Sequence, residues 1–213
     1  MGLLQDPARA MRWYDLVSPV YEPWVAETFW PSDLQRAALD RLDLASGDRV
    51  LDVGCGTGRT ARLLEERAGT VVGLDASAPQ LARAARRPSL ADTVLVRGDG
   101  GRLPFAADSF AAVVSVGAII YFPDPEAALA DARRVTRAGG EVLVVGLNDL
   151  DRAPRTPLEG WAQVATAAYF GHYDRAGAAT LFEAAGWEAV ESAVTGPAWH
   201  PELAIVTTAT APE

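Results

Sequence analysis

Residues 50–58, which read VLDVGCGTG, have the residue types of a ligand-binding turn. An apolar run leads into Gly54, Gly56 and Gly58, and an amphipathic helical pattern follows. Glycines permit a tight turn and let a ligand lie against bare backbone N–H groups at a helix N-terminus. The spacing G-x-G-x-G differs from the G-x-G-x-x-G of dinucleotide-binding enzymes, whose third glycine accommodates packing around a pyrophosphate. The turn therefore favours a nucleotide-like ligand without a pyrophosphate; its alternative is a tight strand-to-helix turn with no ligand.

Two carboxylates follow at the ends of the next two strand-like runs. Asp75 lies about 20 residues beyond the glycine turn, where an acid can accept hydrogen bonds from both hydroxyls of a ribose and would repel a 2′-phosphate. Asp99 ends the neighbouring run and can accept a hydrogen bond from an adenine amino group. Each has a structural alternative, because Asp75 can cap the helix that follows it and Asp99 can stabilise a turn before glycine.

The elements that position these residues alternate between β-branched runs and amphipathic helical patterns from residue 49 onward. This alternation predicts βαβ units and a parallel sheet. We expect strands at 49–53, 70–74, 93–97, 111–116 and 141–145, and a final strand pair at 189–194 and 203–208. We expect helices at 58–67, from after Ser77 to 86, at 125–136 and at 176–185, with Ser77 as an N-cap and Gly139-Gly140 as a stop and turn.

Composition narrows the class of protein. The chain has 213 residues, of which 49% are hydrophobic, enough for the core of one domain. Its formal charge is −9 and its 19 basic residues are all arginines, so a nucleic-acid backbone would be repelled and no nucleic acid is expected as partner. One cysteine and two histidines predict no metal site. Without a long apolar run or a signal-like start, we expect a cytoplasmic monomer or homodimer with no stable membrane insertion.

Four motifs in order make the chain resemble the class I S-adenosylmethionine-dependent methyltransferases, in the small-molecule, methyltransferase type 11-like subgroup. They are LDVGCGTG at 51–58, GLDAS at 73–77, Gly98-Asp99 followed by Leu103-Pro104-Phe105, and Arg134-Val135 before Gly139-Gly140. The resemblance implies an α/β, doubly wound, Rossmann-like fold with a helical N-terminal lid. Its seven-stranded sheet would have the order 3-2-1-4-5-7-6 with the last strand antiparallel. The chain departs from the family pattern at Ala111, where aspartate is usual, and at Ala138, where proline is usual.

The resemblance also implies S-adenosyl-L-methionine as cofactor and a role for each motif. Asp52 and the glycine turn would hold the methionine end, Asp75 the ribose, and Asp99 with Gly100 the adenine, which Gln80 would cover. Cys55 is expected to be a small packed residue and not a nucleophile. The expected cofactor-binding residues are Asp52, Gly54, Cys55, Gly56, Thr57, Gly58, Asp75, Ala76, Gln80, Asp99, Gly100 and Val116.

Methyl transfer from a sulfonium is an in-line displacement, so alignment and desolvation can supply most of the catalysis. Tyr14 and Tyr21 resemble the subgroup's opening tyrosines and could attract the sulfonium through cation–π contacts, or could belong to a packed aromatic helix face. Tyr121 lies in a segment that often carries histidine, and the absence of histidine there argues against a general base in this loop. His172 could take a proton near neutral pH, or could be an incidental loop residue.

We expect a single domain over residues 1–213. It would comprise a helical N-terminal lid at 1–45, a cofactor-binding core at 46–147, a substrate-side insertion at 148–174, and a C-terminal helix and strand pair at 175–213. The expected function is methyl transfer to a small-molecule acceptor: an amine, a phenol, a quinone precursor or a lipid head group. A catalytically silent S-adenosylmethionine-binding regulatory module is the alternative. The glycine spacing and the lack of lysine, hence of a Tyr-x-x-x-Lys pair, argue against a nicotinamide dehydrogenase.

Overall fold

The computed structural model describes residues 30–119, 122–148, 175–196 and 201–213, and four isolated residues, Arg9, Arg12, Leu16 and Glu27. Its strands are β1 (Arg49–Val53), β2 (Thr70–Asp75), β3 (Val94–Arg97), β4 (Phe110–Val116), β5 (Thr136–Leu147), β6 (Glu188–Thr195) and β7 (Ala204–Thr210). Its helices are α3 (Ser32–Leu39), α4 (Arg59–Leu64), α5 (Ala78–Ala84), the 3₁₀ turn η3 (Pro88–Leu90), α6 (Pro125–Val135) and α8 (Arg175–Ala184).

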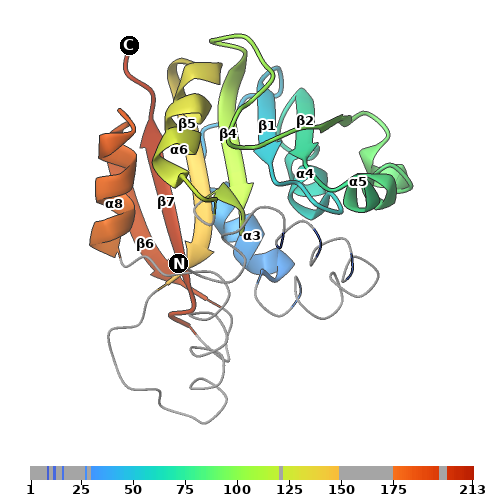
Figure 1. The fold of residues 1–213 in the computed structure, drawn as a ribbon, viewed down its shortest axis with the longest axis horizontal. Coiled ribbons are helices and arrows are strands. Elements are labelled where there is room, and N and C mark those ends of the chain that lie inside the picture. Colours follow the sequence, from blue (N-terminus) through green and yellow to red (C-terminus); the bar gives the residue numbers. More distant parts are fainter. Residues whose placement is uncertain are drawn as a thin grey trace.

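The strands form one seven-stranded sheet in the order β3-β2-β1-β4-β5-β7-β6 (Figure 1). Neighbours from β3 to β5 are parallel, whereas β7 runs antiparallel to both β5 and β6. The predicted strand order and the antiparallel last strand are confirmed. In the part of the chain that the structure describes, no helix is long and apolar enough to cross a membrane.

The central strands are buried on both faces, as their nearly continuous apolar sequences predict. In β4 every residue from Phe110 to Ser115 is buried, and in β1 every residue after Arg49 is buried. The exception in chemistry is Asp52, a carboxylate inside the buried part of β1. Because it is costly to bury a carboxyl group in such a place, its presence indicates a function beyond packing.

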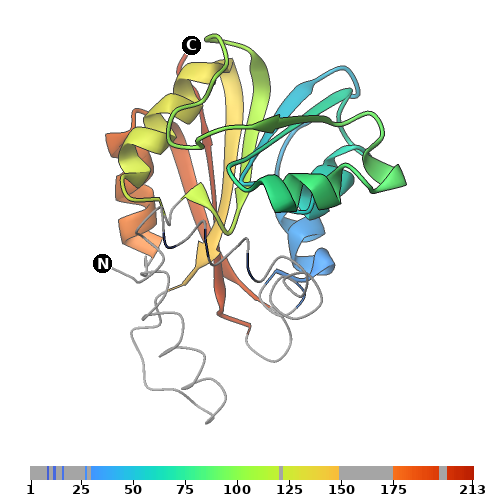
Figure 2. The same ribbon diagram turned by 45° about the vertical axis from the view of Figure 1, so that its right-hand side comes forward.

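The order of the strands creates a switch point between β1 and β4. The chain moves outward in one direction through β1, β2 and β3, and in the other through β4 and β5. Since parallel crossovers are right-handed, α4 and α6 must cover opposite faces of the sheet. The views in Figures 1 and 2 agree with this arrangement, and α6 packs against α8 while α3 packs against α4. Ligands of such sheets bind at the carboxyl ends of the strands beside the switch point.

The largest difference from the expected boundaries is in β5, which begins at Thr136, directly after α6, and not near residue 141. Gly139 and Gly140 lie inside this strand, where the pairing register with β4 is irregular. Gly139 has a φ of +66°, and a Cβ on Gly140 would lie 2.6 Å from the carbonyl oxygen of Ala111. The glycine pair is therefore needed for a bent strand start against β4, and the helix already ends at Val135.

Candidate functional site

The glycine turn joins β1 to α4 with three residues at positive φ: Gly54 at 75°, Gly56 at 54° and Gly58 at 80°. A Cβ on Gly54 would lie 2.3 Å from Ala118 Cβ, and one on Gly58 would lie 2.2 Å from Leu90 Cδ1. A Cβ on Gly56 would meet no atom within 4 Å. Gly54 and Gly58 are therefore required by packing, whereas Gly56 keeps backbone accessible at an open place where a ligand can approach.

Asp75 connects this turn to the end of β2. Its Oδ2 accepts a hydrogen bond of 2.8 Å from the Gly56 N–H, and its Oδ1 accepts one of 2.8 Å from the Ser77 N–H. The helix N-cap is Ser77, whose hydroxyl accepts from the Gln80 N–H, as predicted, so Asp75 is not the cap. The Leu74 carbonyl adds two further bonds, from the N–H groups of residues 54 and 55.

Asp52 lies behind the turn with 1% of its surface exposed. Burial, together with the negative charge of Asp75, raises the pKa of Asp52 to about 8, although a backbone hydrogen bond from Ala61 acts in the opposite direction. Its Oδ2 finds no hydrogen-bond partner among the described residues. A buried carboxylate oxygen without a partner is expensive, so a cationic ligand group that donates hydrogen bonds would stabilise it.

The Cys55 side chain has a packing role and is not positioned as a nucleophile. The thiol is buried, and its Sγ lies 2.9 Å from the place that a Cβ on Gly73 would take. Burial, with the charges of Asp52 and Asp75, raises the pKa of the Cys55 thiol well above its ordinary value. A protonated, packed thiol agrees with the expected packing role. Thr57, also in the turn, is buried as well.

The predicted adenine side lies at the end of β3. Asp99 Oδ1 accepts a hydrogen bond of 2.9 Å from the Gly101 N–H, which shapes the turn and engages one of the two carboxylate oxygens. Gly100 is buried beneath Phe122, whose ring carbons lie 2.7 Å from its Cβ position. Gln80 is 2% exposed, and its Oε1 has no hydrogen-bond partner within the described ranges. Two acceptor groups are thus available for a polar base.

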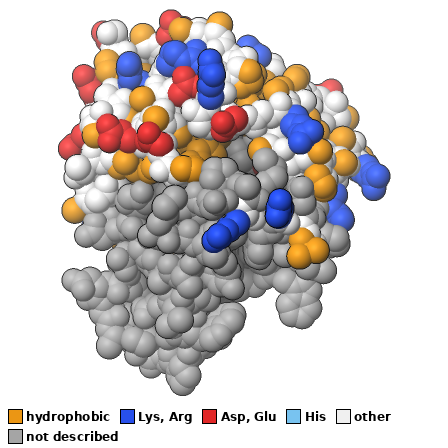
Figure 3. Space-filling view, viewed as in Figure 1, with side chains coloured by type: hydrophobic (Ala, Val, Ile, Leu, Met, Phe, Trp, Pro, Cys, Tyr) orange, Lys and Arg blue, Asp and Glu red, His pale blue; other side chains and the backbone are white. Residues whose placement is uncertain are grey.

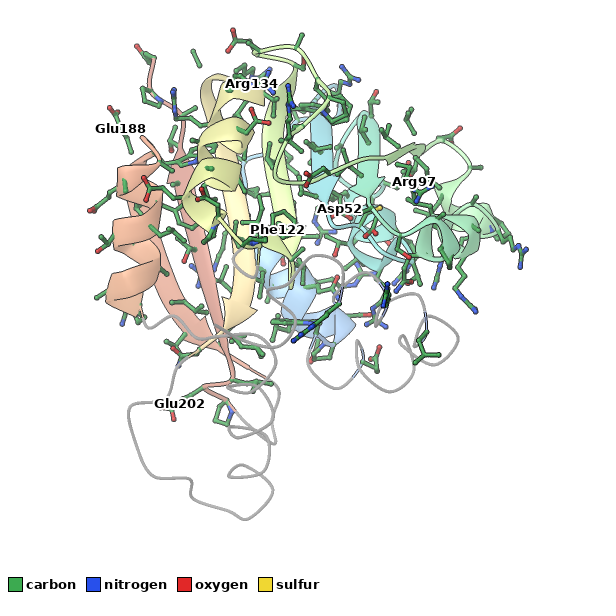
Figure 4. All side chains as sticks on the ribbon, viewed as in Figure 1. Asp52, Arg97, Phe122, Arg134, Glu188 and Glu202 are labelled. Atoms are coloured by element: carbon green, nitrogen blue, oxygen red, sulfur yellow. The ribbon has the colours of Figure 1, made fainter. Side chains whose placement is uncertain are left out.

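Arg97, the last residue of β3, connects the ends of β2 and β3. It pairs with Asp75 in the register of β2 and β3, and its Nε donates to the Ala76 carbonyl at 3.2 Å. In Figure 4 its label lies on the β3 side of Asp52, while Phe122 lies on the β4 side. Ala76 is therefore held in place beside the carboxylate expected to bind the ribose.

On the other side of the switch point, β4 ends at Val116, which pairs with Val145 of β5. The next residue, Gly117, has a φ of +67°, and a Cβ there would lie 2.8 Å from Trp30 Nε1. Trp30 is only 6% exposed, and its carbonyl accepts a 2.7 Å bond from the Gln35 side chain. An indole ring therefore lies against the residue that follows β4.

A second contact ties this region to the glycine turn. Arg59, the residue after Gly58, donates to the Trp30 carbonyl at 3.3 Å and forms an ion pair of 2.6 Å with Glu27. The chain around residues 27–30 is therefore attached to the start of α4.

Charge is unevenly distributed on the face seen in Figure 3. Acidic side chains gather toward α8, whereas the basic side chains are spread over the upper part of this face and toward α5, with hydrophobic side chains between them. On the described part of this face the arginines do not form an uninterrupted stripe of the kind that follows a nucleic-acid backbone. Among the residues that the structure describes, no group of three or more His, Cys, Asp or Glu side chains could hold a metal ion.

The structure brings the described part of the predicted cofactor site together at the ends of β1, β2, β3 and β4. The four predicted catalytic residues, Tyr14, Tyr21, Tyr121 and His172, lie outside the described residues. Phe122 and Trp30 were not among the predicted site residues, although both belong to aromatic segments that the sequence shows beside the motifs. Their contacts with glycines have no sequence signal of their own.

Comparison with known proteins gives a consistent result. A family model described as a methyltransferase domain matches residues 51–144. The chain is 36% identical over 146 residues to the chloroplastic 2-methyl-6-phytyl-1,4-hydroquinone methyltransferase of Arabidopsis thaliana, and this match covers 67% of this chain and 43% of that protein. It is 35% identical over 160 residues to the demethylmenaquinone methyltransferase of Beutenbergia cavernae, covering 75% of this chain and 62% of that protein.

Among solved structures, phosphoethanolamine N-methyltransferase 2 of Haemonchus contortus, in complex with S-adenosyl-L-methionine, has the same fold. The TM-score is 0.79 at 17% identity, and the match covers 100% of this chain and 61% of that one. At this identity the likeness concerns the fold alone. The chain spans less than two thirds of the length of the relatives named above.

Proposed function

The chain belongs to the class I S-adenosylmethionine-dependent methyltransferase family, and on that premise we propose that it transfers a methyl group from S-adenosylmethionine to a small-molecule acceptor. The observation that carries the proposal is the junction of β1 and β2. There an open glycine turn, a buried carboxylate with an unpartnered oxygen and a carboxylate that accepts from the turn all meet. This set suits a ligand that has a cationic end and a ribose.

The residues fit the cofactor part by part. Asp52 would hold the cationic amino group of the methionine end, because its buried Oδ2 requires a donor. Asp75 would accept from the ribose hydroxyls, because it places a carboxylate at the end of β2, directly beside the glycine turn. Asp99 and Gln80 would accept from the adenine amino group or lie against the ring. S-adenosylmethionine, when bound, supplies an electrophilic methyl group on a positively charged sulfonium.

The chain's own contribution is alignment and the exclusion of water. The glycine turn is fixed to β2 by two hydrogen bonds to the Leu74 carbonyl and by one from the Gly56 N–H to the Asp75 carboxylate, so the groups that bind the donor are held before the ligand arrives. Trp30 against Gly117 and Phe122 over Gly100 put aromatic surface beside two strand ends. Such surfaces displace water from a reacting methyl group and can attract a sulfonium. Tyr14, Tyr21, Tyr121 and His172 remain the proposed catalytic residues.

We propose further that the acceptor is a hydroquinone-type ring. The support is the identity of 36% and 35% to enzymes named for a phytyl hydroquinone and for demethylmenaquinone. A hydroquinone ring is rich in electrons, so a ring carbon beside a phenolic oxygen can form the new bond to the methyl group and then lose its proton. This reaction needs close alignment and a dry pocket more than a strong base.

The test is transfer of labelled methyl from S-adenosylmethionine to a panel of acceptors. The panel contains a demethylmenaquinol, a hydroquinone without a prenyl tail, a simple phenol and a primary amine. We expect label on the ring of the quinols, and no label with Gly56→Ala protein. Label on the amine alone would overturn the hydroquinone assignment. Tight binding of S-adenosylhomocysteine without turnover of any acceptor would favour the silent regulatory module.

A further inference from the structure

Two side chains near the end of α6 hold the connection between β3 and β4. Arg134 donates from Nη1 to the Phe105 carbonyl at 2.8 Å and from Nη2 to the Leu103 carbonyl at 3.0 Å. Its Nε donates to Asp131 Oδ1 at 2.6 Å, and Asp131 Oδ2 accepts from the Leu103 N–H at 2.6 Å. The acid and the base therefore bind both each other and three backbone groups of one loop.

The pair remains charged in this place. Partial burial by itself would raise the pKa of Asp131, but the hydrogen bonds from Arg134 and from the Leu103 N–H lower it below its ordinary value. A planar guanidinium can donate in several fixed directions at once, which lysine cannot do. An exposed ion pair contributes little by itself, so the significance of this pair lies in the loop that it holds.

The loop that is held carries the predicted adenine-binding residues. Pro104 lies between the two clamped residues, and its Cγ is 3.6 Å from the Cβ position of Gly98. Leu74 Cδ1 contacts the same position at 3.1 Å, so Gly98 is enclosed between β2 and the loop. Asp99 follows directly. The clamp on the loop therefore limits where the Asp99 carboxylate can lie.

The other end of α6 meets the same loop. Phe122 lies two residues before Asp124, which caps α6 by accepting from the Ala127 N–H at 3.0 Å. The Phe122 ring covers Gly100. Figure 4 shows Phe122 near Asp52 and Arg134 well away from both, at the far end of α6. Arg134 can thus affect the ligand only through the loop that it holds.

We propose that Asp131 and Arg134 are positioning residues that hold Asp99 and Gly100 in the geometry needed to recognise the amino group of adenine. This inference rests on the proposed use of S-adenosylmethionine. It predicts that the pair controls which base is accepted as well as how tightly the ligand binds. A pair with only a structural role would change affinity for all ligands by the same factor.

The probe for this role is a pair of ligands that differ at one group of the base. S-adenosylhomocysteine carries the 6-amino group, and S-inosylhomocysteine carries a carbonyl in its place, which a carboxylate repels. We expect the unmodified protein to bind the adenine form about tenfold or more tightly, because the carboxylate hydrogen bond is charge-assisted. In Arg134→Gln this ratio should fall by about threefold or more, since coupling through a held loop is of that order.

The matched control is Arg36→Gln. Arg36 forms a two-bond ion pair with Glu66 on the surface, at 2.7 and 3.3 Å, and neither partner is among the expected site residues. Its ratio should equal that of the unmodified protein. Arg134→Lys and Asp131→Asn are measured in parallel, so that the test stands if Arg134→Gln does not fold. Lysine keeps the positive charge but lacks the planar guanidinium that donates in several fixed directions. The ratio of the two affinities should therefore fall in Arg134→Lys as well.

An unchanged ratio in the folded variants, with the unmodified protein discriminating, would overturn this inference and leave the proposed function intact. Equal binding of the two ligands by the unmodified protein would also overturn it, because Asp99 would then not read the base. No binding of S-adenosylhomocysteine by the unmodified protein would overturn both the inference and the proposed function.

Discussion

Asp75 Oδ2 accepts a 2.8 Å hydrogen bond from the backbone N–H of Gly56, across 19 residues of sequence. The carboxylate expected to bind the ribose and the open residue of the glycine turn are therefore one structural unit. A change at either residue alters the position of the other. Substitutions at the site must for this reason be compared with controls of similar structural cost elsewhere in the fold.

Gly56→Ala should lose cofactor binding without losing the fold. Its φ of +54° costs an alanine about 1–2 kcal/mol, but the new Cβ would meet no protein atom within 4 Å. Gly139→Ala is the control, because Gly139 has a φ of +66° and equally open surroundings away from the site. We expect similar losses in urea unfolding for both variants. Calorimetry with S-adenosylhomocysteine should show a loss of about tenfold or more for Gly56→Ala alone.

Asp75→Ala should weaken the binding of S-adenosylhomocysteine by about tenfold or more, because charge-assisted hydrogen bonds contribute about 1.5–3 kcal/mol each. Stability should fall as well, since the N–H groups of Gly56 and Ser77 lose their acceptor. Asp48→Ala is the comparison: it removes the acceptor of the Ala45 N–H at the opposite end of β1. An affinity as high in Asp75→Ala as in Asp48→Ala would restrict Asp75 to a structural role.

Stability of the ligand-free protein should depend on pH through Asp52. Burial raises the pKa of Asp52 to about 8, whereas aspartate in an unfolded chain titrates near about 3.9. Between these values the folded state holds a proton that the unfolded state lacks. The Asp52 contribution to the free energy of unfolding should therefore fall, by up to about 1.4 kcal/mol per pH unit, as the pH rises from about 4 to 8.

Asp52→Asn cannot ionise and keeps the shape of the side chain, so it should lack this decline. Urea unfolding of both proteins at several pH values between about 5 and 8 measures the difference. Parallel stability curves would show that Asp52 stays ionised in the folded protein. Binding of a ligand with a cationic amino group should also release protons near neutral pH, which calorimetry in buffers of different ionisation enthalpy detects.

The expected N-terminal lid makes a separate prediction for residues 13–30. A lid excludes water and completes a site when the ligand is bound, so hydrogen exchange in this segment should slow on addition of S-adenosylhomocysteine. Its attachment point is the contact of Glu27 and Trp30 with Arg59. High and equal protection with and without the ligand would indicate a permanent structural element. Exchange in β7, which carries no expected cofactor-binding residue, is the internal reference and should not change.

The sequence determined the local elements and the residue types at their ends. β-branched runs specify the strands because buried parallel strands are apolar on both faces. Glycine spacing and the carboxylates after two runs specify the cofactor side, because strand ends in a doubly wound sheet meet at one edge. The family motifs added the strand order. These signals are short-range, so they are readable without coordinates.

Only the tertiary structure decided the contacts that join distant residues. The glycine pair 139–140 carries a local turn signal, but it lies within β5, where the Gly139 N–H donates to the Ala211 carbonyl and the Gly140 carbonyl accepts from the Ala211 N–H. Arg134 meets Phe105 across 29 residues, and Trp30 packs on Gly117 from the far side of the glycine turn in sequence. Such contacts depend on side-chain packing and hydrogen-bond geometry after the sheet has formed. The Arg134–Phe105 and Trp30–Gly117 contacts leave no periodic pattern or fixed residue spacing in the sequence from which they could be predicted.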